Sequence, residues 1–370
     1  MERQIGHTCF VAVWHLSHTE LVIRTCLYLA LQARHQEYVS AAVVNSSKMW
    51  QQHSPTIRPL WYNESFPPVD FDTLSDEELT IVTAYFDIGE FQKGYGGSMF
   101  TPKLYQKWLT IFAQIKNPVI AFFDNADHAA LMQVLRKNYP KTRIVVIDRR
   151  TLWSFRELQP HIAKIFSRQG YPFNPPNTVV PNYSAAMHSK YELMRWAIRD
   201  NPFRSTYICW LDVGLFRDLA YDSVASAVSG DDAFRLGVPP NLDSSKVAYS
   251  VVFPDLPHTP LSAQQVVVQN SVWVCGCFFI GRIDVMWQWT FEYLLATERM
   301  VSEEWMGTDQ QVIYWLFLGE GKEKLQPKTS IQLYKVDDGS NVWFYLGYLA
   351  KKAGEHHYQR RPTPHPVPTG

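Results

Sequence analysis

From residue 79 onward, short apolar runs alternate with segments whose apolar residues recur at helical spacing. This alternation constrains the fold more than any other feature, because strands that alternate with helices form a sheet with helices on its faces. We therefore predict an α/β fold with a mixed, mostly parallel sheet and helices on both faces. The predicted strands are residues 79–86, 119–123, 143–147, 207–211, 248–253, 272–280 and 331–335, and the predicted helices are 102–115, 128–139, 152–168, 183–199, 284–296, 311–317 and 343–352.

The regular pattern covers only part of the chain of 370 residues. Residues 1–78 are interpreted as an N-terminal extension and linker, since the stretch 53–76 is rich in proline and has little periodicity. Polar and charged residues interrupt the apolar stretch 8–33, so we do not expect it to span a membrane. The regular pattern predicts one α/β domain over residues 79–355, and residues 356–370 are predicted to form a flexible tail.

Composition excludes some classes of partner. Lys and Arg together number 35, as do Asp and Glu, so the formal net charge is zero. A nucleic-acid-binding protein needs a basic excess to neutralise phosphates, so no nucleic-acid partner is expected. The five cysteines are an odd number and match no zinc-binding spacing. We expect those in apolar runs to act as small hydrophobic residues, without a disulfide framework.

One predicted strand runs straight into an acidic residue. The segment TYICWLDVGLFRD places Asp212 directly after the apolar run and Gly214 two residues later. Open α/β sheets bind ligands beyond the carboxyl ends of their strands, so an acid at this position is well placed for a metal or a phosphate-bearing ligand. The alternative is that Asp212 only begins a turn after a core strand.

Several stretches together resemble a known family. TIVTAYFDIG, IFAQIKNPVIAFFDN, HSKYELM and WLDVGLFRD resemble the HtrL/YibB family, which is similar to nucleotide-sugar glycosyltransferases of the GT-A fold, over residues 79–350. The resemblance implies a GT-A-like, Rossmann-like sheet in which the first strand lies against the nucleotide and a later helix reaches its diphosphate. The donor-binding residues that we predict on this basis are Thr83, Tyr85, Asp87, Lys190, Asp212, Gly214 and Gly276.

The resemblance also implies a divalent metal, Mn²⁺ or Mg²⁺, held by Asp212. Transferases of this kind carry an Asp-x-Asp motif, whereas Asp212-Val213-Gly214 supplies only the first acid. One carboxylate can suffice when substrate phosphates complete the shell. The residues considered for completing the shell are Asp218, Asp337, Asp338, His356 and His357. The alternative is catalysis without a metal, in which Lys190 or Arg217 neutralises the leaving diphosphate.

Other candidate residues each have a structural alternative. We predict Asp309 to be catalytic, as the general base or by holding sugar hydroxyls, but it also lies where a helix cap is expected. Gly276 marks a close approach either to a sugar or to a neighbouring strand. Asp87 contacts the ribose or base, or else forms a turn. The glycine-rich turn 93–97 lacks dinucleotide and P-loop spacing, and we expect a mobile loop over the donor.

These observations favour a glycosyltransferase that moves a sugar from a nucleotide-sugar donor to a glycan or a lipid-linked acceptor such as a glycolipid. The alternative is a catalytically degenerate fold of the same kind that binds a glycan or a partner protein, because the second acid of the metal motif is missing. An oxidoreductase is disfavoured, since the glycine fingerprint of dinucleotide-binding folds is absent. The sequence leaves the compartment open between cytoplasm and, for a eukaryotic protein, the Golgi lumen.

Overall fold

A computed structural model describes residues 73–254 and 259–359. Predictions for the extension before residue 73, including the apolar stretch 8–33, and for residues 360–370 lie outside this range. Helix α11 (Tyr345–Gln359) continues past residue 355, where the predicted domain was expected to end. Throughout the described ranges, every helix is too short or too polar to cross a bilayer.

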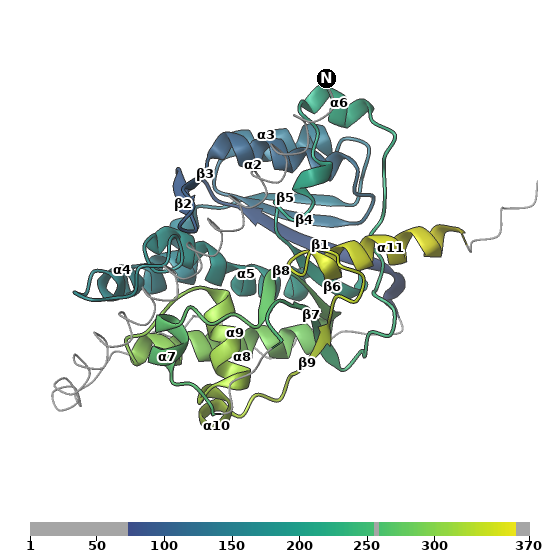
Figure 1. Ribbon diagram of the computed structural model, residues 1–370. Coiled ribbons are helices and arrows are strands. Elements are labelled where there is room, and N and C mark those ends of the chain that lie inside the picture. The colour runs from purple at the N-terminus through teal and green to yellow at the C-terminus, as the bar shows by residue number, and fades with distance from the viewer. Residues whose placement is uncertain (1–72, 255–258, 360–370) are drawn as a thin grey trace, which may run out of the picture. The chain divides into compact units, whose positions relative to one another are not determined.

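The central feature is a sheet in the order β5-β4-β1-β6-β8-β7-β9 (Figure 1). Neighbouring strands are parallel except where β8 pairs with β6 and with β7, so β8 alone runs against the other strands of this sheet. The mixed, mostly parallel sheet predicted from the sequence is confirmed. The strands are β1 (Ser75–Tyr85), β2 (Phe91–Lys93), β3 (Ser98–Phe100), β4 (Val119–Phe123), β5 (Thr142–Val146), β6 (Ser205–Leu211), β7 (Lys246–Val251), β8 (Val274–Arg282) and β9 (Ser330–Tyr334).

A helix forms in each segment where the apolar periodicity predicts one, and three short helices that were not predicted, α6, α7 and α10, form as well. Thr101 caps α2 by accepting a hydrogen bond from the backbone of Leu104, and Pro102 occupies the first turn, where its missing N–H costs nothing. Pro160 likewise lies in the first turn of α4 after a π-helical turn, so the helical segment continues instead of breaking. The helices besides α11 are α2 (Pro102–Leu109), α3 (Ala126–Leu135), α4 (Gln159–Phe166), α5 (Pro181–Asp200), α6 (Val224–Ser229), α7 (Ala263–Val268), α8 (Ile283–Ser302), α9 (Asp309–Leu318) and α10 (Gly321–Leu325).

Helices cover both faces of the sheet, as predicted. On one face α4, α5, α8 and α9 pack against alternate strand residues such as Val82 and Trp210. On the other face α2, α3 and α11 pack against the residues between them, such as Ile81 and Cys209. Figure 1 shows α2 and α3 above the parallel strands and α5, α8 and α9 below them. Successive residues of β1 and β6 are buried on alternate faces of the sheet, so the two strands contribute to two cores, one on each side.

The connections create a crevice between β1 and β6. From β1 the chain proceeds outward to β4 and β5, then returns through α5 to place β6 on the opposite side of β1. This is a topological switch point, where side chains and loops diverge beyond the carboxyl ends of the strands. The hairpin β2–β3 follows β1 at this end. Its turn is fixed by hydrogen bonds from Gly94 N to Pro175 O (2.9 Å) and from the Tyr95 hydroxyl to Phe173 O (2.7 Å).

Candidate functional site

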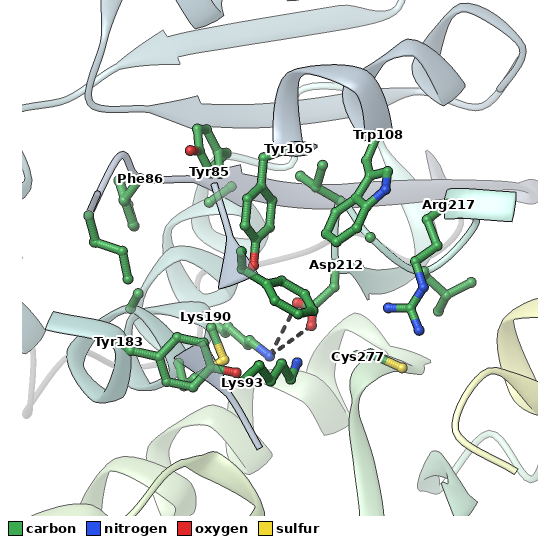
Figure 2. Close-up of a pocket in the computed structure, with 18 of the residues that line it drawn as sticks. Tyr85, Phe86, Lys93, Tyr105, Trp108, Tyr183, Lys190, Asp212, Arg217 and Cys277 are labelled. Carbon is green, nitrogen blue, oxygen red and sulfur yellow. Dashed lines mark hydrogen bonds and ion pairs between the residues drawn. The ribbon is translucent and has the colours of Figure 1, made fainter. Parts of the chain in front are cut away.

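A pocket opens at this switch point, beyond the ends of β1 and β6. The hairpin β2–β3, the first turns of α2 and α5, and the segments that follow β6 and precede α11 surround it. Its lining combines aromatic rings with a small number of charged groups (Figure 2). The lining residues are Ala84, Tyr85, Phe86, Ile88, Gly89, Phe91, Lys93, Phe100, Tyr105, Trp108, Tyr183, Ala186, Met187, Lys190, Trp210, Asp212, Val213, Gly214, Leu215, Arg217, Cys277 and Phe344.

Lys190 closes the base of the pocket and is almost completely buried, with its side chain 2% exposed. Its Nζ lies 3.2 Å from an oxygen of Asp212, 3.2 Å from an oxygen of Asp309, and 3.0 Å from the Gly276 carbonyl. Burial opposes the charge of Lys190, but the two carboxylates outweigh burial and hold its pKa above the ordinary value. Lys190 is therefore a charged residue already matched by protein groups.

Asp212 is the member of this cluster whose carboxylate is open to the pocket. Its backbone N–H donates to Cys277 O on β8 (2.9 Å), which fixes the residue at the end of β6. Its carboxylate accepts from the indole Nε1 of Trp210 (2.6 Å) and from Lys190, yet remains 31% exposed. Of the residues lining the pocket, Asp212 alone carries a carboxylate.

Asp309 lies behind Lys190 and does not line the pocket. It is the first residue of α9 and its side chain is only 3% exposed. Burial raises the pKa of the Asp309 carboxyl and the nearby Asp212 adds to this, while Lys190 opposes it. A Cβ added at Gly276 would come within 2.1 Å of an Asp309 oxygen, so the close approach expected at this glycine is to the Asp309 side chain.

Two further cations face the pocket without a carboxylate partner in the described residues. Lys93 projects from the hairpin with its Nζ 5.2 Å from the centre of the Phe100 ring. Arg217 is held between two rings, 5.7 Å from that of Trp108 and 4.7 Å from that of Phe344. Protein crowds Lys93 on most sides although its side chain reaches the solvent, and this desolvation lowers its pKa against the opposing pull of Asp212.

The walls are a continuous aromatic surface. Tyr105 lies at its centre, 4.9 Å between ring centres from both Tyr85 and Trp108, and Phe91 lies 5.0 Å from Tyr183. In Figure 2 the Tyr105 hydroxyl points toward Asp212 and the Tyr183 hydroxyl toward Lys93. Burial raises the pKa of both phenols, so both remain protonated donors at neutral pH.

Gly214 allows one wall to close up. A Cβ at this position would stand 3.0 Å from the Trp108 ring, tighter than an ordinary contact. The residue that stands in place of the second acid of an Asp-x-Asp motif thus gives the indole of Trp108 room to approach the end of β6. Trp108 in turn supports Arg217.

The structure places the other predicted donor residues around the pocket in different ways. Tyr85 lines it, but Thr83 is fully buried in β1, with its hydroxyl unpaired within the described residues. The Asp87 carboxylate accepts from Gly89 N (3.1 Å), which is the turn alternative. Ile88 and Gly89 of this turn line the pocket, whereas Asp87 does not.

Sequence reasoning did not single out Lys93, Tyr105, Trp108 and Tyr183 as site residues. Lys93 falls in the glycine-rich turn that was expected to cover the donor, and the structure shows a hairpin there. The three aromatic residues occur at helical positions that are equally typical of a core, so only their spatial convergence identifies them. Tyr183 comes from the first turn of α5, more than seventy residues after Tyr105.

The predicted metal can be tested against the groups that surround Asp212. No cluster of three or more His, Cys, Asp or Glu side chains that would suit a metal ion occurs in residues 73–254 and 259–359. Asp218 accepts instead from the Tyr348 hydroxyl (2.6 Å), and Asp338 from Ser340 N (3.0 Å). Asp337 lies 3.5 Å from the Tyr345 hydroxyl. The side chains of the other two candidates, His356 and His357, are not among those that the structure describes. The described residues at this pocket therefore do not fit a divalent metal.

One cysteine expectation is wrong. Cys275 and Cys277 are bonded to each other, with Cα atoms 5.5 Å apart, whereas the sequence predicted two isolated hydrophobic residues. They can meet because residues two apart on a strand project to the same face. Cys277 lines the pocket next to Asp212. Cys209 is buried and unpaired, as expected.

Comparison with known proteins gives one family and distant similarities to solved structures. The family described as "Bacterial protein of unknown function (HtrL_YibB)" matches residues 77–318. No curated protein matches the chain.

Similar solved structures include 4-diphosphocytidyl-2C-methyl-D-erythritol synthase from Anaerococcus prevotii, with 9% identity and a TM-score of 0.30 over 77% of this chain and 100% of that one. Another is mouse xyloside xylosyltransferase 1 in its apo form, with 10% identity and a TM-score of 0.33 over 70% of this chain and 85% of that one. Likenesses this distant carry no argument about activity.

Proposed function

Because this chain belongs to the HtrL/YibB family, whose function is unknown, we propose from its own pocket that it is a glycosyltransferase using a nucleotide-sugar donor. The observation that supports this most is the combination of Lys93 and Arg217, both without carboxylate partners in the described residues, with aromatic walls at a topological switch point. A nucleotide sugar carries a planar base, a doubly charged diphosphate and a polar sugar, and the pocket offers a complementary surface for each.

Each part of the donor has a matching group. The partly exposed ring of Tyr105 offers a stacking surface for the base and is supported by the buried rings of Tyr85 and Trp108. Stacking of this kind is worth about 1–3 kcal/mol per base in other proteins. The two cations stabilise the diphosphate as it leaves, when negative charge develops on it. The acceptor proposed is the hydroxyl of a glycan or glycolipid.

Asp212 has the position to orient sugar hydroxyls, since its carboxylate is the one that lines the pocket. Asp309, expected from the sequence to be catalytic, acts in this proposal as a positioning residue. It holds Lys190, and Lys190 holds Asp212 (3.2 Å at each contact). Gly276 leaves room for the Asp309 carboxylate in this cluster, and Gly214 leaves room for the Trp108 ring.

A thermal-shift panel tests the proposal. The protein is heated with UDP, GDP, CDP or ADP and with the corresponding nucleotide sugars, each with EDTA and with Mn²⁺. A ligand at a hundredfold excess over its dissociation constant stabilises the folded state by about 2.7 kcal/mol, which raises the midpoint. A shift with one nucleotide supports a donor site and names its base. No shift with any nucleotide, from folded protein, would contradict the proposal.

A second candidate is a degenerate fold of the same kind that binds a glycan or partner protein without turnover. Gly214 in place of a second acid favours it, as does the engagement of Asp212 with Lys190. The two candidates differ in chemistry. A transferase slowly hydrolyses its nucleotide sugar when no acceptor is present, releasing nucleoside diphosphate. A binding protein leaves the nucleotide sugar intact, so chromatography of the nucleotides distinguishes the two.

A further inference from the structure

We infer that the pocket binds the diphosphate of its ligand without a divalent metal, through Lys93 and Arg217. This inference rests on the proposed function, because it concerns the donor of that same site. It follows from the disagreement between the metal implied by the sequence and the groups present. The Asp212 carboxylate contacts the Lys190 ammonium at the place where a metal-binding carboxylate would contact a metal ion. Among the described residues, no cluster of acidic or other ligands that would suit a metal surrounds it.

The charges around the pocket already suit an anion. Lys93 lies within electrostatic range of two other cations, Lys190 and Arg217, and of the carboxylates of Asp212 and Asp309. Three positive and two negative groups leave a net charge of +1, and the two carboxylates share the buried Lys190. Lys93 and Arg217, which contact no carboxylate in the described residues, are therefore available to a nucleotide-sugar diphosphate, and the net charge of the five groups offsets one of its two negative charges. A divalent cation placed here would be repelled by three cationic side chains.

The Asp212 carboxylate is also committed to groups of the protein. One oxygen accepts from Trp210 at 2.6 Å and lies 3.2 Å from Lys190, and the other oxygen lies 3.3 Å from the same ammonium. A metal at Asp212 would have to share the carboxylate with Lys190, because the Lys190 side chain is only 2% exposed and cannot move away into solvent. The geometry gives Lys190 the place that a metal ion would take beside Asp212, and Asp212 and Asp309 share its single positive charge.

The two pocket cations are held in position before any ligand arrives. Arg217 is stacked between Trp108 and Phe344, and its planar guanidinium suits bidentate contact with phosphate oxygens. Lys93 ends a strand whose turn is fixed to Pro175 by a backbone hydrogen bond of 2.9 Å. Pre-ordered side chains lose less conformational entropy on binding. Lys93 and Arg217 are thus exposed, lack a carboxylate partner in the described residues and are held in place, which suits them to bind a diphosphate.

Calorimetric titration of the full chain tests the inference with UDP, GDP, CDP and ADP, and with inorganic pyrophosphate as competitor. In EDTA we expect one nucleotide to bind, pyrophosphate to displace it, and added Mn²⁺ or Mg²⁺ to change its affinity by less than about threefold. Lys93→Gln and Arg217→Gln should each weaken binding about tenfold or more, as expected for loss of a charge-assisted contact. Arg217→Lys should recover part of the loss if charge matters.

Matched controls remove exposed cations outside the pocket. Lys103→Gln in α2 and Arg150→Gln after β5 take away the same charge without touching the lining, and should leave the affinity within about twofold. If the controls weaken binding as much as the pocket variants, the effect is a general loss of positive charge and the inference is wrong.

The variant Asp212→Asn distinguishes most clearly between metal-free and metal-dependent binding of the diphosphate. It keeps the size of the side chain and an oxygen for Trp210, and leaves Lys190 paired with Asp309. Without a metal, removing this negative charge should tighten nucleotide binding several-fold; with a metal held by Asp212, it should abolish binding. Binding that requires Mn²⁺ and is lost in Asp212→Asn overturns the inference but leaves the proposed function standing. Absence of nucleotide binding under every condition overturns both.

Discussion

Three cationic side chains line one pocket, but they differ in burial and in their partners: Lys190 is buried, whereas Lys93 and Arg217 are exposed. Lys190 is 2% exposed and contacts two carboxylates and a carbonyl. Lys93 and Arg217 are exposed and rest on aromatic rings, with no carboxylate partner in the described part of the chain. Burial accounts for the difference, because a cation removed from water must be matched by protein groups, whereas one that reaches the solvent need not be.

This contrast separates stability from binding at a single site. The Lys190 cluster ties α5 to the end of β6 and the start of α9, so its energy is committed to the fold. We expect the two exposed cations to contribute little to the fold, and under the proposed function their interaction energy is available to a ligand. Substitution of Lys190 should therefore lower the free energy of unfolding more than substitution of Lys93 or Arg217.

The largest effect is expected from Lys190→Met. Removing the ammonium leaves the Asp212 and Asp309 carboxylates facing each other with no cation between them. Breaking a buried ion pair in this way typically costs about 3–5 kcal/mol of unfolding free energy. Urea denaturation measures the loss, and Lys164→Met, at an exposed lysine of α4, is the matched control. A loss below about 1 kcal/mol would show that Lys190 is not the anchor of this cluster.

A second buried charge on α5 makes stability depend on pH. Glu192 is 2% exposed and accepts from the backbone N–H groups of Trp153 (2.9 Å) and Ser154 (3.2 Å). Burial raises its pKa from 4.5 to about 7, against the opposing effect of these hydrogen bonds. A group whose pKa is higher in the folded state than in the unfolded state stabilises the protein fully at a pH below its unfolded-state pKa. This stabilisation is lost as the pH rises through its folded-state pKa.

The comparison with Glu192→Gln isolates this contribution, since glutamine does not titrate. The advantage of the wild type in unfolding free energy should be greatest below pH 4.5 and should fall by about 3 kcal/mol as the pH rises through about 7. Urea denaturation at pH 4.5 and pH 8 measures it. A difference that stays constant between these pH values would mean that Glu192 is charged in the folded protein throughout.

A smaller effect is expected from Gly276→Ala, which inserts a methyl group against the buried carboxylate. The added Cβ would stand 2.1 Å from an Asp309 oxygen, so the Lys190 cluster must shift. Overpacking of this kind costs about 1–3 kcal/mol. Gly96→Ala is the control, because a Cβ there meets nothing within 4 Å. Equal thermal midpoints for the two variants would contradict the tight packing of Gly276.

The smallest effect on stability is expected for the exposed cations. Lys93→Gln and Arg217→Gln lose only contacts with rings, worth about 0.5–1 kcal/mol at exposed sites. Denaturation of both variants alongside Lys190→Met completes the comparison. If either lost as much stability as Lys190→Met, its charge would belong to the fold and would not be reserved for a ligand.

The sequence by itself determined the architecture and the centre of the site. Apolar runs of strand length alternating with helical periodicity predicted the sheet and the layers on both its faces. The run from Tyr207 into Asp212 predicted a strand that ends in an acid, and the structure places that acid in the pocket. These features are local, because they depend on the order of apolar and polar residues along one segment.

Only the tertiary structure decided how the charges are shared. The sequence gives no sign that Lys190 lies 3.2 Å from Asp309, which is 119 residues later, or that Gly276 faces that carboxylate. It likewise leaves Lys93 as one residue of a glycine-rich turn until the hairpin brings it within electrostatic range of Asp212. Whether a charge is paired or available depends on burial and on neighbours from distant segments. These arise only when the chain folds, so the sequence located the pocket but could not say which of its cations are free for a ligand.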